Sequence, residues 1–211
     1  MDQYLKVFRA YNNRRRLSPE LSSYLQQHAL CFSLKARENL VERDQNTDMW
    51  YFIEKGIMRY YMLPRRENFT YRFKSENEFM LFDNNAWEKR NAELRIGIDA
   101  VTDAVLWSIP GEVIRTALLM FPEFKVPHTN AIWKECDDSD DFGTPREYKS
   151  IRYEMLHKHY VKLIHRLSIE DMASFVCVDA NQLEAMLSGK TKAKLPFRIP
   201  LPINRGNIRR R

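Results

Sequence analysis

Hydrophobic and polar positions follow two different spacings in the first half of the chain. Residues 17–28 carry apolar positions at helical spacing, with Ser18 as N-cap and Pro19 in the first helical position, where its missing N–H costs nothing. Between residues 31 and 109, short aromatic and β-branched runs are separated by polar, turn-forming stretches. Gly56 stands between two such runs and fits a tight turn. This spacing predicts many short strands, as in an all-β barrel or roll.

Helical spacing returns at Gly111. The apolar positions that share one face of this helix are Val113, Ile114, Ala117, Leu118 and Phe121. We expect Pro122 and Pro127 to interrupt the helical structure, so that residues 130–136 form only about two further turns of helix. Residues 137–145 then contain four aspartates, a glycine and a proline, which indicates a linker.

Three further helices are predicted at the carboxyl end. Residues 144–147 and 168–171 have the spacing of capping boxes, and Asp179 can cap the third helix. The expected inward positions are Tyr148, Ile151, Met155 and Leu156 in the first helix, Ile169, Met172, Ala173 and Val176 in the second, and Leu183, Met186 and Leu187 in the third. A turn of three or four residues joins the last two helices, which is the outline of a helix-turn-helix.

Charge changes the picture only at the carboxyl end. The chain has a formal net charge of +6, yet residues 188–211 contain eight basic residues and no acid. The remainder has 34 − 8 = 26 basic residues against 28 acidic residues, a net charge of −2. A basic tail attracts nucleic-acid phosphates, and it is equally compatible with a solvated, disordered end.

Several classes of protein are disfavoured. Cys31, Cys136 and Cys177 are far apart and form no CxxC pair, so we expect buried free thiols in a reducing cytoplasm rather than disulfides, zinc or an iron–sulfur cluster. No apolar run reaches membrane-spanning length, and the amino end lacks the apolar segment of a signal peptide. The GxSxG, HExxH and P-loop signatures are missing. We therefore expect a cytoplasmic protein that is not an enzyme, with no catalytic residues, cofactor or bound metal.

Three stretches of the sequence resemble those of the Crp/Fnr superfamily of bacterial transcription regulators: residues 34–62, 98–110 and 151–187. The first stretch contains a match to the family's YFIxKGxxRxY core, and the third matches its RYxxLL helix and helix-turn-helix. The resemblance implies an α+β fold: a jelly-roll (double-stranded β-helix) domain of the cyclic-nucleotide-binding type, a connecting helix that dimerises, and a C-terminal winged-helix-like domain. Three prolines in residues 195–206 predict a reduced or absent wing. The expected domains are 1–121, 122–143 and 144–211.

The resemblance also suggests an effector pocket. The Gly-Glu pair of cyclic-nucleotide-binding members aligns with Asn77-Glu78, and their phosphate-binding Arg aligns with Leu94. The candidate pocket residues are Glu78, Phe79 and the neighbouring Arg95. Because a buried anion needs a cation or aligned N–H donors, the missing Arg predicts no control by cyclic AMP or GMP. Two alternatives stay open: a different, less charged effector, or a roll interior filled by the protein's own aromatic side chains, such as Phe73, Phe79, Phe82 and Trp87.

The DNA-reading helix departs from the family pattern. A Ser-Arg pair becomes Glu184-Ala185, and the final basic residue becomes Leu187. The candidate residues for contacts with the bases are then Asn181 and Gln182, whose amides can pair with adenine. Phosphate contacts fall to Lys190, Lys192 and Lys194.

The turn and the dimer helix depart as well. The family's Leu-Gly becomes Val176-Cys177, and a left-handed Cys costs on the order of 1 kcal/mol against Gly. A homodimer would be weakened by repulsion between two copies of the acidic run that begins at Asp137. The leading hypothesis is a DNA-binding regulator, with DNA, a homodimer partner and an unidentified small-molecule effector as its partners and no membrane. The alternative is an interaction or sensing module that keeps the fold without binding DNA.

Overall fold

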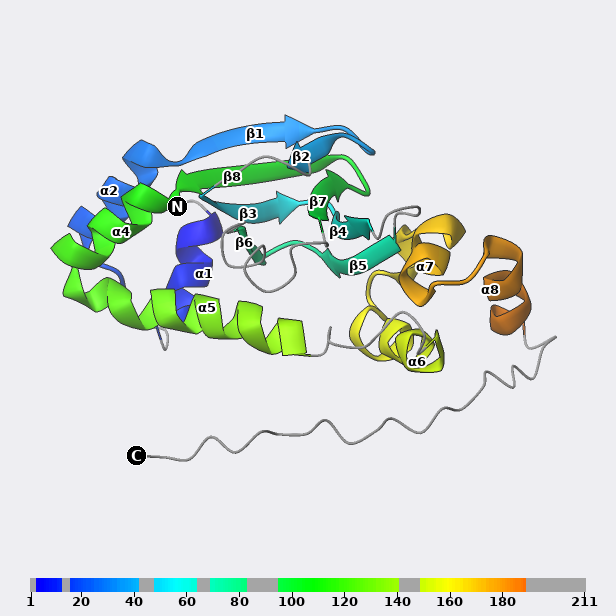
Figure 1. Ribbon diagram of the computed structural model, residues 1–211. Coiled ribbons are helices and arrows are strands. Elements are labelled where there is room, and N and C mark those ends of the chain that lie inside the picture. Colours follow the sequence, from blue (N-terminus) through cyan, green and yellow to red (C-terminus); the bar gives the residue numbers. More distant parts are fainter. Residues whose placement is uncertain are drawn as a thin grey trace, which may run out of the picture.

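The computed structural model describes residues 3–12, 16–41, 48–63, 69–82, 95–140 and 149–188 (Figure 1). The strands are β1 (Leu30–Leu34), β2 (Asn39–Val41), β3 (Met49–Lys55), β4 (Met58–Leu63), β5 (Phe69–Lys74), β6 (Phe79–Phe82), β7 (Arg95–Ala100) and β8 (Ala104–Pro110). The helices are α1 (Gln3–Tyr11), α2 (Pro19–His28), α4 (Gly111–Met120), α5 (Lys125–Asp140), α6 (Lys149–His159), α7 (Ile169–Val176) and α8 (Ala180–Leu187). Short 3-10 turns occupy Pro122–Phe124 (η1) and Ile164–Arg166 (η2).

The strands form two four-stranded antiparallel sheets, which confirms the predicted β-roll. One sheet has the order β1-β8-β3-β6 and the other β2-β7-β4-β5. Gly56 joins β3 to β4 with φ 102°, a left-handed conformation that disfavours any other residue. A Cβ atom at Gly56 would lie 2.7 Å from the carbonyl oxygen of Asp103. The glycine is therefore required both by its conformation and by the chain that crosses it.

All eight strands contribute to one hydrophobic cluster inside the roll. Its buried members are Leu34, Val41, Tyr51, Ile53, Met58, Tyr60, Tyr71, Met80, Ile98, Ala100, Ala104 and Leu106. Side chains alternate along a strand, so in β3 Tyr51 and Ile53 face this interior while Trp50 and Phe52 face outward. The expectation that Phe73 and Phe79 fill the interior is therefore wrong, because both belong to clusters outside the roll. Trp87 and the side chain of Phe82 lie outside the described residues.

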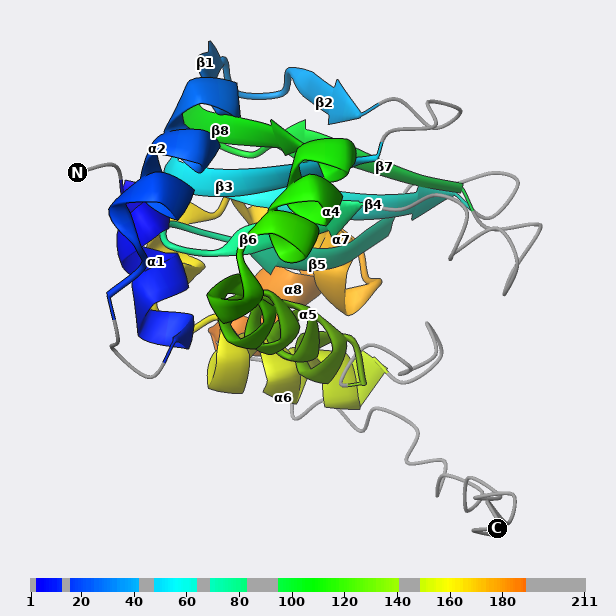
Figure 2. The ribbon, with the colours of Figure 1, turned by 90° about the vertical axis from the view of Figure 1, so that its left-hand side faces the viewer.

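Helices α1, α2, α4 and α5 cover the outer face of the first sheet, and Figure 2 looks onto α2 and α4 from this side. Helix α2 begins as predicted, since the Ser18 hydroxyl accepts from the N–H of Leu21 at 3.2 Å. Helix α1 was not predicted from the sequence. It contributes Tyr4, Leu5 and Phe8, each at most 1% exposed, to this outer cluster.

Helix α5 is longer than predicted. It runs over 16 residues from Lys125, and Pro127 does not interrupt it. Pro127 is the third helical residue, where the backbone N–H has no partner within the helix and its loss costs little. The capping box of residues 144–147 lies outside the described residues. None of the described helices combines the length and apolar character needed to cross a membrane. The prediction of buried thiols is wrong for Cys31 of β1, which is exposed.

Helix α7 packs against β5 at the outer face of the second sheet, and α6 and α8 pack against α7 (Figure 1). Ile57, Phe73 and Val101 of the roll join the buried side chains of these helices in a third cluster. The Phe73 ring lies 5.4 Å from that of Tyr160 and 5.8 Å from that of Phe175. The roll and the C-terminal helices thus share one hydrophobic seam.

Candidate nucleic-acid interface

Helices α7 and α8 form the predicted helix-turn-helix, and both caps are confirmed. The Ser168 hydroxyl accepts from the N–H of Asp171 at 3.1 Å, and the Asp179 carboxylate accepts from the N–H of Gln182 at 2.7 Å. Cys177 ends α7 in the left-handed region, at φ 62° and ψ 45°. The chain therefore makes the turn that Gly serves in the family, at a cost on the order of 1 kcal/mol.

The outer face of α8 is polar and open. Asn181, Gln182 and Glu184 are exposed, while Leu183 is fully buried in the cluster that the C-terminal helices share with the roll. The prediction that Leu187 faces inward is wrong, since it is 40% exposed. Leu187 is the last residue of α8, and Leu183 is the single buried side chain of this helix. The packed part of α8 is therefore its first half, and the two candidate base-reading amides lie there on the solvent side.

Residues 168–188 carry four acids and no basic residue. Positive charge for phosphate contacts would have to come from elsewhere. Lys190, Lys192 and Lys194 lie outside the described residues, so their assignment stays a prediction. Of the five residues predicted to contact DNA, Asn181 and Gln182 are the two that the structure describes, and both are exposed on α8.

Asp171, in the first turn of α7, connects the helix-turn-helix to the roll. Its carboxylate is 2% exposed and accepts two hydrogen bonds from the Arg37 guanidinium, at 2.6 and 2.8 Å. Arg59 of β4 lies 3.4 Å from the same carboxylate and also donates to Asp99 at 2.9 Å. Burial alone would raise the pKa of Asp171, but the hydrogen bonds from Arg37 and Ser168 and the charges of both arginines lower it. The carboxylate is therefore held ionised within the seam.

Further hydrogen bonds hold α6 and α7 to strand β5. The Thr70 N–H donates to the Ser174 hydroxyl at 2.9 Å. Arg152, which is 1% exposed, donates to the carbonyl oxygen of Thr70 at 2.7 Å and to that of Phe175. Burial lowers the pKa of Arg152. Arg152 is the Arg of the RYxxLL match, and in this fold it joins a strand of the roll to the end of α7.

A third contact joins the β5–β6 turn to η2. Arg166 donates to both oxygens of Glu76, at 2.7 and 2.9 Å, and Glu76 also accepts from the Gly56 N–H at 2.9 Å. The hydrogen bonds from Arg166, above all, lower the pKa of Glu76 to about 2. The polar contacts between the roll and the C-terminal helices were not predicted from the sequence, because their partners are far apart along the chain: Arg37 and Asp171 are separated by 134 positions.

The three candidate effector residues do not share one environment. Glu78 lies in the β5–β6 turn after Asn77, whose φ is 69°, and its carboxylate accepts from the Ser75 N–H at 2.7 Å. Phe79 points to the helical cover, with its ring 4.5 Å from that of Phe8. The side chain of Arg95 lies outside the described residues. An effector site formed by Glu78, Phe79 and Arg95 stays a prediction.

No protein-family model matches the sequence, and no curated protein matches it either. Solved structures do match in fold. A cyclic nucleotide-binding domain containing protein from Listeria monocytogenes aligns with TM-score 0.60 and 11% identity, over 81% of this chain and 87% of that chain. FixK2 from Bradyrhizobium japonicum aligns with TM-score 0.56 and 12% identity, over 76% of this chain and 83% of that chain.

A protein of Eubacterium rectale assigned to the crp/fnr family of transcriptional regulators aligns with TM-score 0.51 and 14% identity, over 82% of this chain and 83% of that chain. These identities are too low to transfer a function, but each alignment covers more than three quarters of this chain. The chain therefore has, over most of its length, the fold of Crp/Fnr family regulators and of cyclic-nucleotide-binding domains.

Proposed function

We propose that the protein is a DNA-binding transcriptional regulator of the Crp/Fnr type. The observation that carries this proposal is the exposed amino end of α8, which displays Asn181 and Gln182 next to an intact helix-turn-helix turn. In such motifs, the amino-terminal residues of the second helix meet the base edges of the major groove. Asn and Gln amides pair with adenine through its N6 and N7 atoms.

The attraction to phosphate comes from the tail in this proposal. The acids of residues 168–188 oppose DNA, whereas eight basic residues follow directly after them, and Lys190, Lys192 and Lys194 are the nearest. Phosphate contacts supply most of the sequence-independent affinity for DNA. Specific reading and electrostatic attraction would thus be divided between α8 and the tail.

Control by cyclic AMP or GMP is not part of this function. Leu94 stands where the family's phosphate-binding Arg aligns, and Glu78 accepts from Ser75 and lies 3.8 Å from Lys74. A carboxylate engaged in this way would have to exchange its partners before it could hold a ribose.

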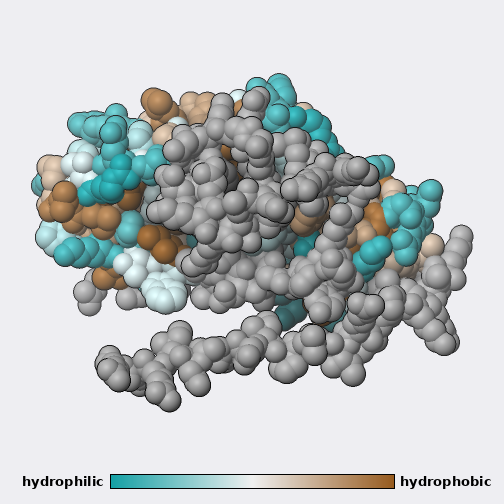
Figure 3. Space-filling view, in the orientation of Figure 1, coloured by the Kyte–Doolittle hydropathy of each residue, from teal (hydrophilic) through white to brown (hydrophobic). Residues whose placement is uncertain are grey.

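A homodimer fits the surface of α4 and α5. Leu119, Met120, Val126 and Trp133 are exposed by 46% or more, and Figure 3 shows hydrophobic side chains at the end of the molecule where α4 lies. Exposed apolar groups of this kind mark interaction surfaces. A two-fold dimer would present two copies of α8 and favour a palindromic operator.

A second function class is favoured by one observation. Neither α7 nor α8 has an Arg or Lys, and the acidic Glu184 is exposed at the position where the family pattern has Ser. An interaction or sensing module that kept the fold without binding DNA would have such a face.

Selection from a random pool of double-stranded DNA distinguishes the two functions. The regulator should enrich a motif, and a variant with Asn181→Ala and Gln182→Ala should lose preference at particular base pairs by about 1–3 kcal/mol each. Gln27→Ala, an exposed amide on α2, is the matched control and should leave the motif unchanged.

Salt dependence tests the tail separately. Replacing Lys190, Lys192 and Lys194 by Ala should reduce the slope of log K against log salt by about 2.7, at about 0.9 per phosphate contact. The same change at Lys6, an exposed lysine of α1 that lies outside the α4–α5 surface, should leave the slope unchanged. Absence of any enriched motif, with weak binding that disappears near physiological salt, would favour the interaction module instead.

A further inference from the structure

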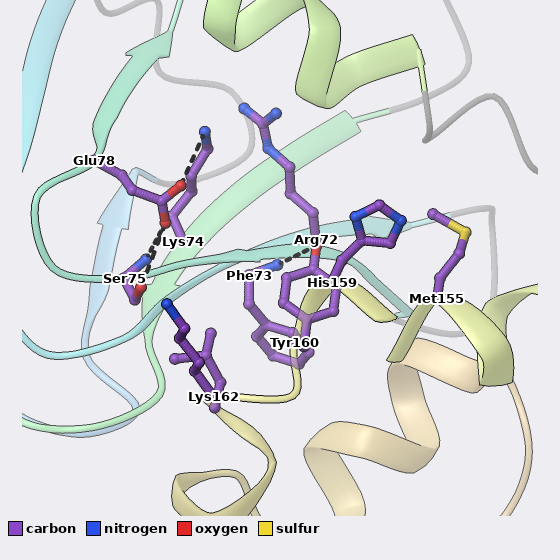
Figure 4. A pocket seen from close by; sticks show the side chains of 10 residues that line it. Arg72, Phe73, Lys74, Ser75, Glu78, Met155, His159, Tyr160 and Lys162 are labelled. Atoms are coloured by element: carbon purple, nitrogen blue, oxygen red, sulfur yellow. Dashed lines mark hydrogen bonds and ion pairs between the residues drawn. The ribbon is translucent and has the colours of Figure 1, made fainter. Parts of the chain in front are cut away.

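A cavity of about 240 Å³ opens between strand β5 and the end of α6. Both parts of the protein line it: Arg72, Lys74 and Glu78 come from the roll, and His159, Tyr160 and Lys162 come from the C-terminal helices (Figure 4). The Phe73 N–H donates a hydrogen bond to the Tyr160 hydroxyl at 3.4 Å, and this contact closes the cavity toward the hydrophobic seam. The cavity is therefore bounded by fixed elements on both sides.

The roll side of the cavity is built around two buried cations. Arg72 and Lys74 are each 3% exposed and lie two residues apart on β5, so they share one face of the strand. Both form ion pairs with Glu135 of α5, and the Lys74 Nζ lies 3.1 Å from its Oε2. The Arg72 guanidinium also stacks 4.6 Å above the Tyr60 ring. Cations held in a dry, packed setting interact with an anion far more strongly than exposed ones do.

The C-terminal helices contribute two more basic side chains to the cavity, His159 and Lys162. Lys162 and His159 are exposed at the mouth of the cavity, and Figure 4 shows them approaching from the end of α6 and the segment after it. Glu78 is the one acid among the described residues that line the cavity. The described residues that line the cavity thus include four basic side chains and one carboxylate.

We propose that this cavity binds a small phosphorylated metabolite, whose phosphate monoester is held between the β5 cations and Lys162. Arginine recognises phosphate by paired N–H bonds, and lysine supplies a point charge. The volume is below the range of about 300–1,000 Å³ that is usual for drug-sized ligands, so the ligand is a compact one. The site is separate from the exposed face of α8, and its binding does not depend on whether α8 reads DNA.

Glu135 acts as an internal competitor for the ligand. Its carboxylate already occupies Arg72 and Lys74, so a bound phosphate shares these cations with it or displaces it. Removing the charge of Glu135 should therefore strengthen binding, whereas removing that of Lys162 should weaken it. Opposite effects from Lys162, which lines the cavity, and Glu135, which pairs with its cations, would not arise from a general change in surface charge.

Calorimetric titration of the full chain tests the proposal without DNA. Inorganic phosphate and glycerol 3-phosphate are the probes, and glycerol and sodium chloride at equal ionic strength are the controls. We expect saturable binding of glycerol 3-phosphate, weakened about tenfold by Lys162→Gln and strengthened several-fold by Glu135→Gln. Lys158→Gln, which removes an exposed lysine of α6 away from the cavity, should change the affinity less than twofold.

Three results would overturn the proposal. One is the absence of saturable binding of either phosphate probe to the unaltered chain. Another is equal weakening by Lys162→Gln and Lys158→Gln, which would mean diffuse surface attraction. The third is saturable binding of a dicarboxylate such as malate with no binding of glycerol 3-phosphate, which would exclude the phosphate assignment. Lys162 and Lys158 are both exposed, so these variants keep the fold and the comparison stays decisive.

Discussion

Asp171→Asn should loosen the C-terminal helices from the roll. The substitution keeps the size of the side chain and removes the charge that Arg37 and Arg59 share. Breaking a buried ion pair costs about 3–5 kcal/mol when an uncompensated charge stays buried. Here Arg37 is 51% exposed and can be hydrated, and Arg59 keeps Asp99, so the cost is lower. We expect a loss of about 2 kcal/mol in the free energy of unfolding at pH 7, close to one charge-assisted hydrogen bond.

Urea unfolding of the full chain measures this loss, and Glu170→Gln is the control. Glu170 is exposed in the same first turn of α7, so the same change of charge there should alter stability by less than about 0.5 kcal/mol. Combining Asp171→Asn with Arg37→Gln should give less than the sum of the two single losses, with a coupling of about 1 kcal/mol.

The effect of Asp171→Asn should also depend on pH. The pKa of Asp171 is lower in the folded protein than in the unfolded chain, so its contribution is present above the unfolded pKa of about 3.9. The contribution is lost as pH falls through the lower folded pKa, and the stabilities of variant and parent should converge in this acid range. A loss below about 0.5 kcal/mol at pH 7, or a difference that stays constant into the acid range, would refute the reasoning.

Three other changes test single features of the fold by the same unfolding measurement. Cys177→Gly should raise the free energy of unfolding by about 0.5–1 kcal/mol, because glycine relieves the left-handed residue at the end of α7; a fall would contradict this. Gly56→Ala should lower it by about 2 kcal/mol, because Gly56 has a φ of 102° and an added Cβ atom would clash with the backbone of Asp103. A neutral result would contradict this. Glu76→Gln should cost about 1–2 kcal/mol near neutral pH by weakening the contact with Arg166. That loss should disappear as pH falls from about 4.5 through about 2, and a loss that persists at acid pH would count against the ion pair.

Local signals in the sequence were sufficient for most of the element order. Ser18, Ser168 and Asp179 each stand next to a helical pattern, and each caps a helix in the structure. Such signals depend on neighbouring residues alone, which is why they can be identified without a fold. The prediction that Pro127 interrupts the helix was wrong. A proline that breaks the middle of a helix is harmless in its first turn, and the sequence alone did not show where α5 begins.

The faces of the strands could not be assigned in the same way. Phe73 and Phe79 look like interior residues, and each is buried, but on the outer side of its sheet. Which side a residue of β5 or β6 faces depends on the helices that cover each sheet, and those helices come from distant parts of the chain. Asp171 shows the same limit, since its cap role is local while its pairing with Arg37 exists only in the folded protein.

The shared seam between the roll and the C-terminal helices limits how far the two halves are interchangeable. Phe73 is covered by Tyr160 and Phe175, and Arg152 bonds both to β5 and to the end of α7. A C-terminal unit transplanted from another protein of this fold would have to reproduce these contacts, or else leave an apolar strand face in water. The roll of this protein is therefore matched to its own helix-turn-helix, and a chimera of the two halves would have to exchange the β5 face together with the helices.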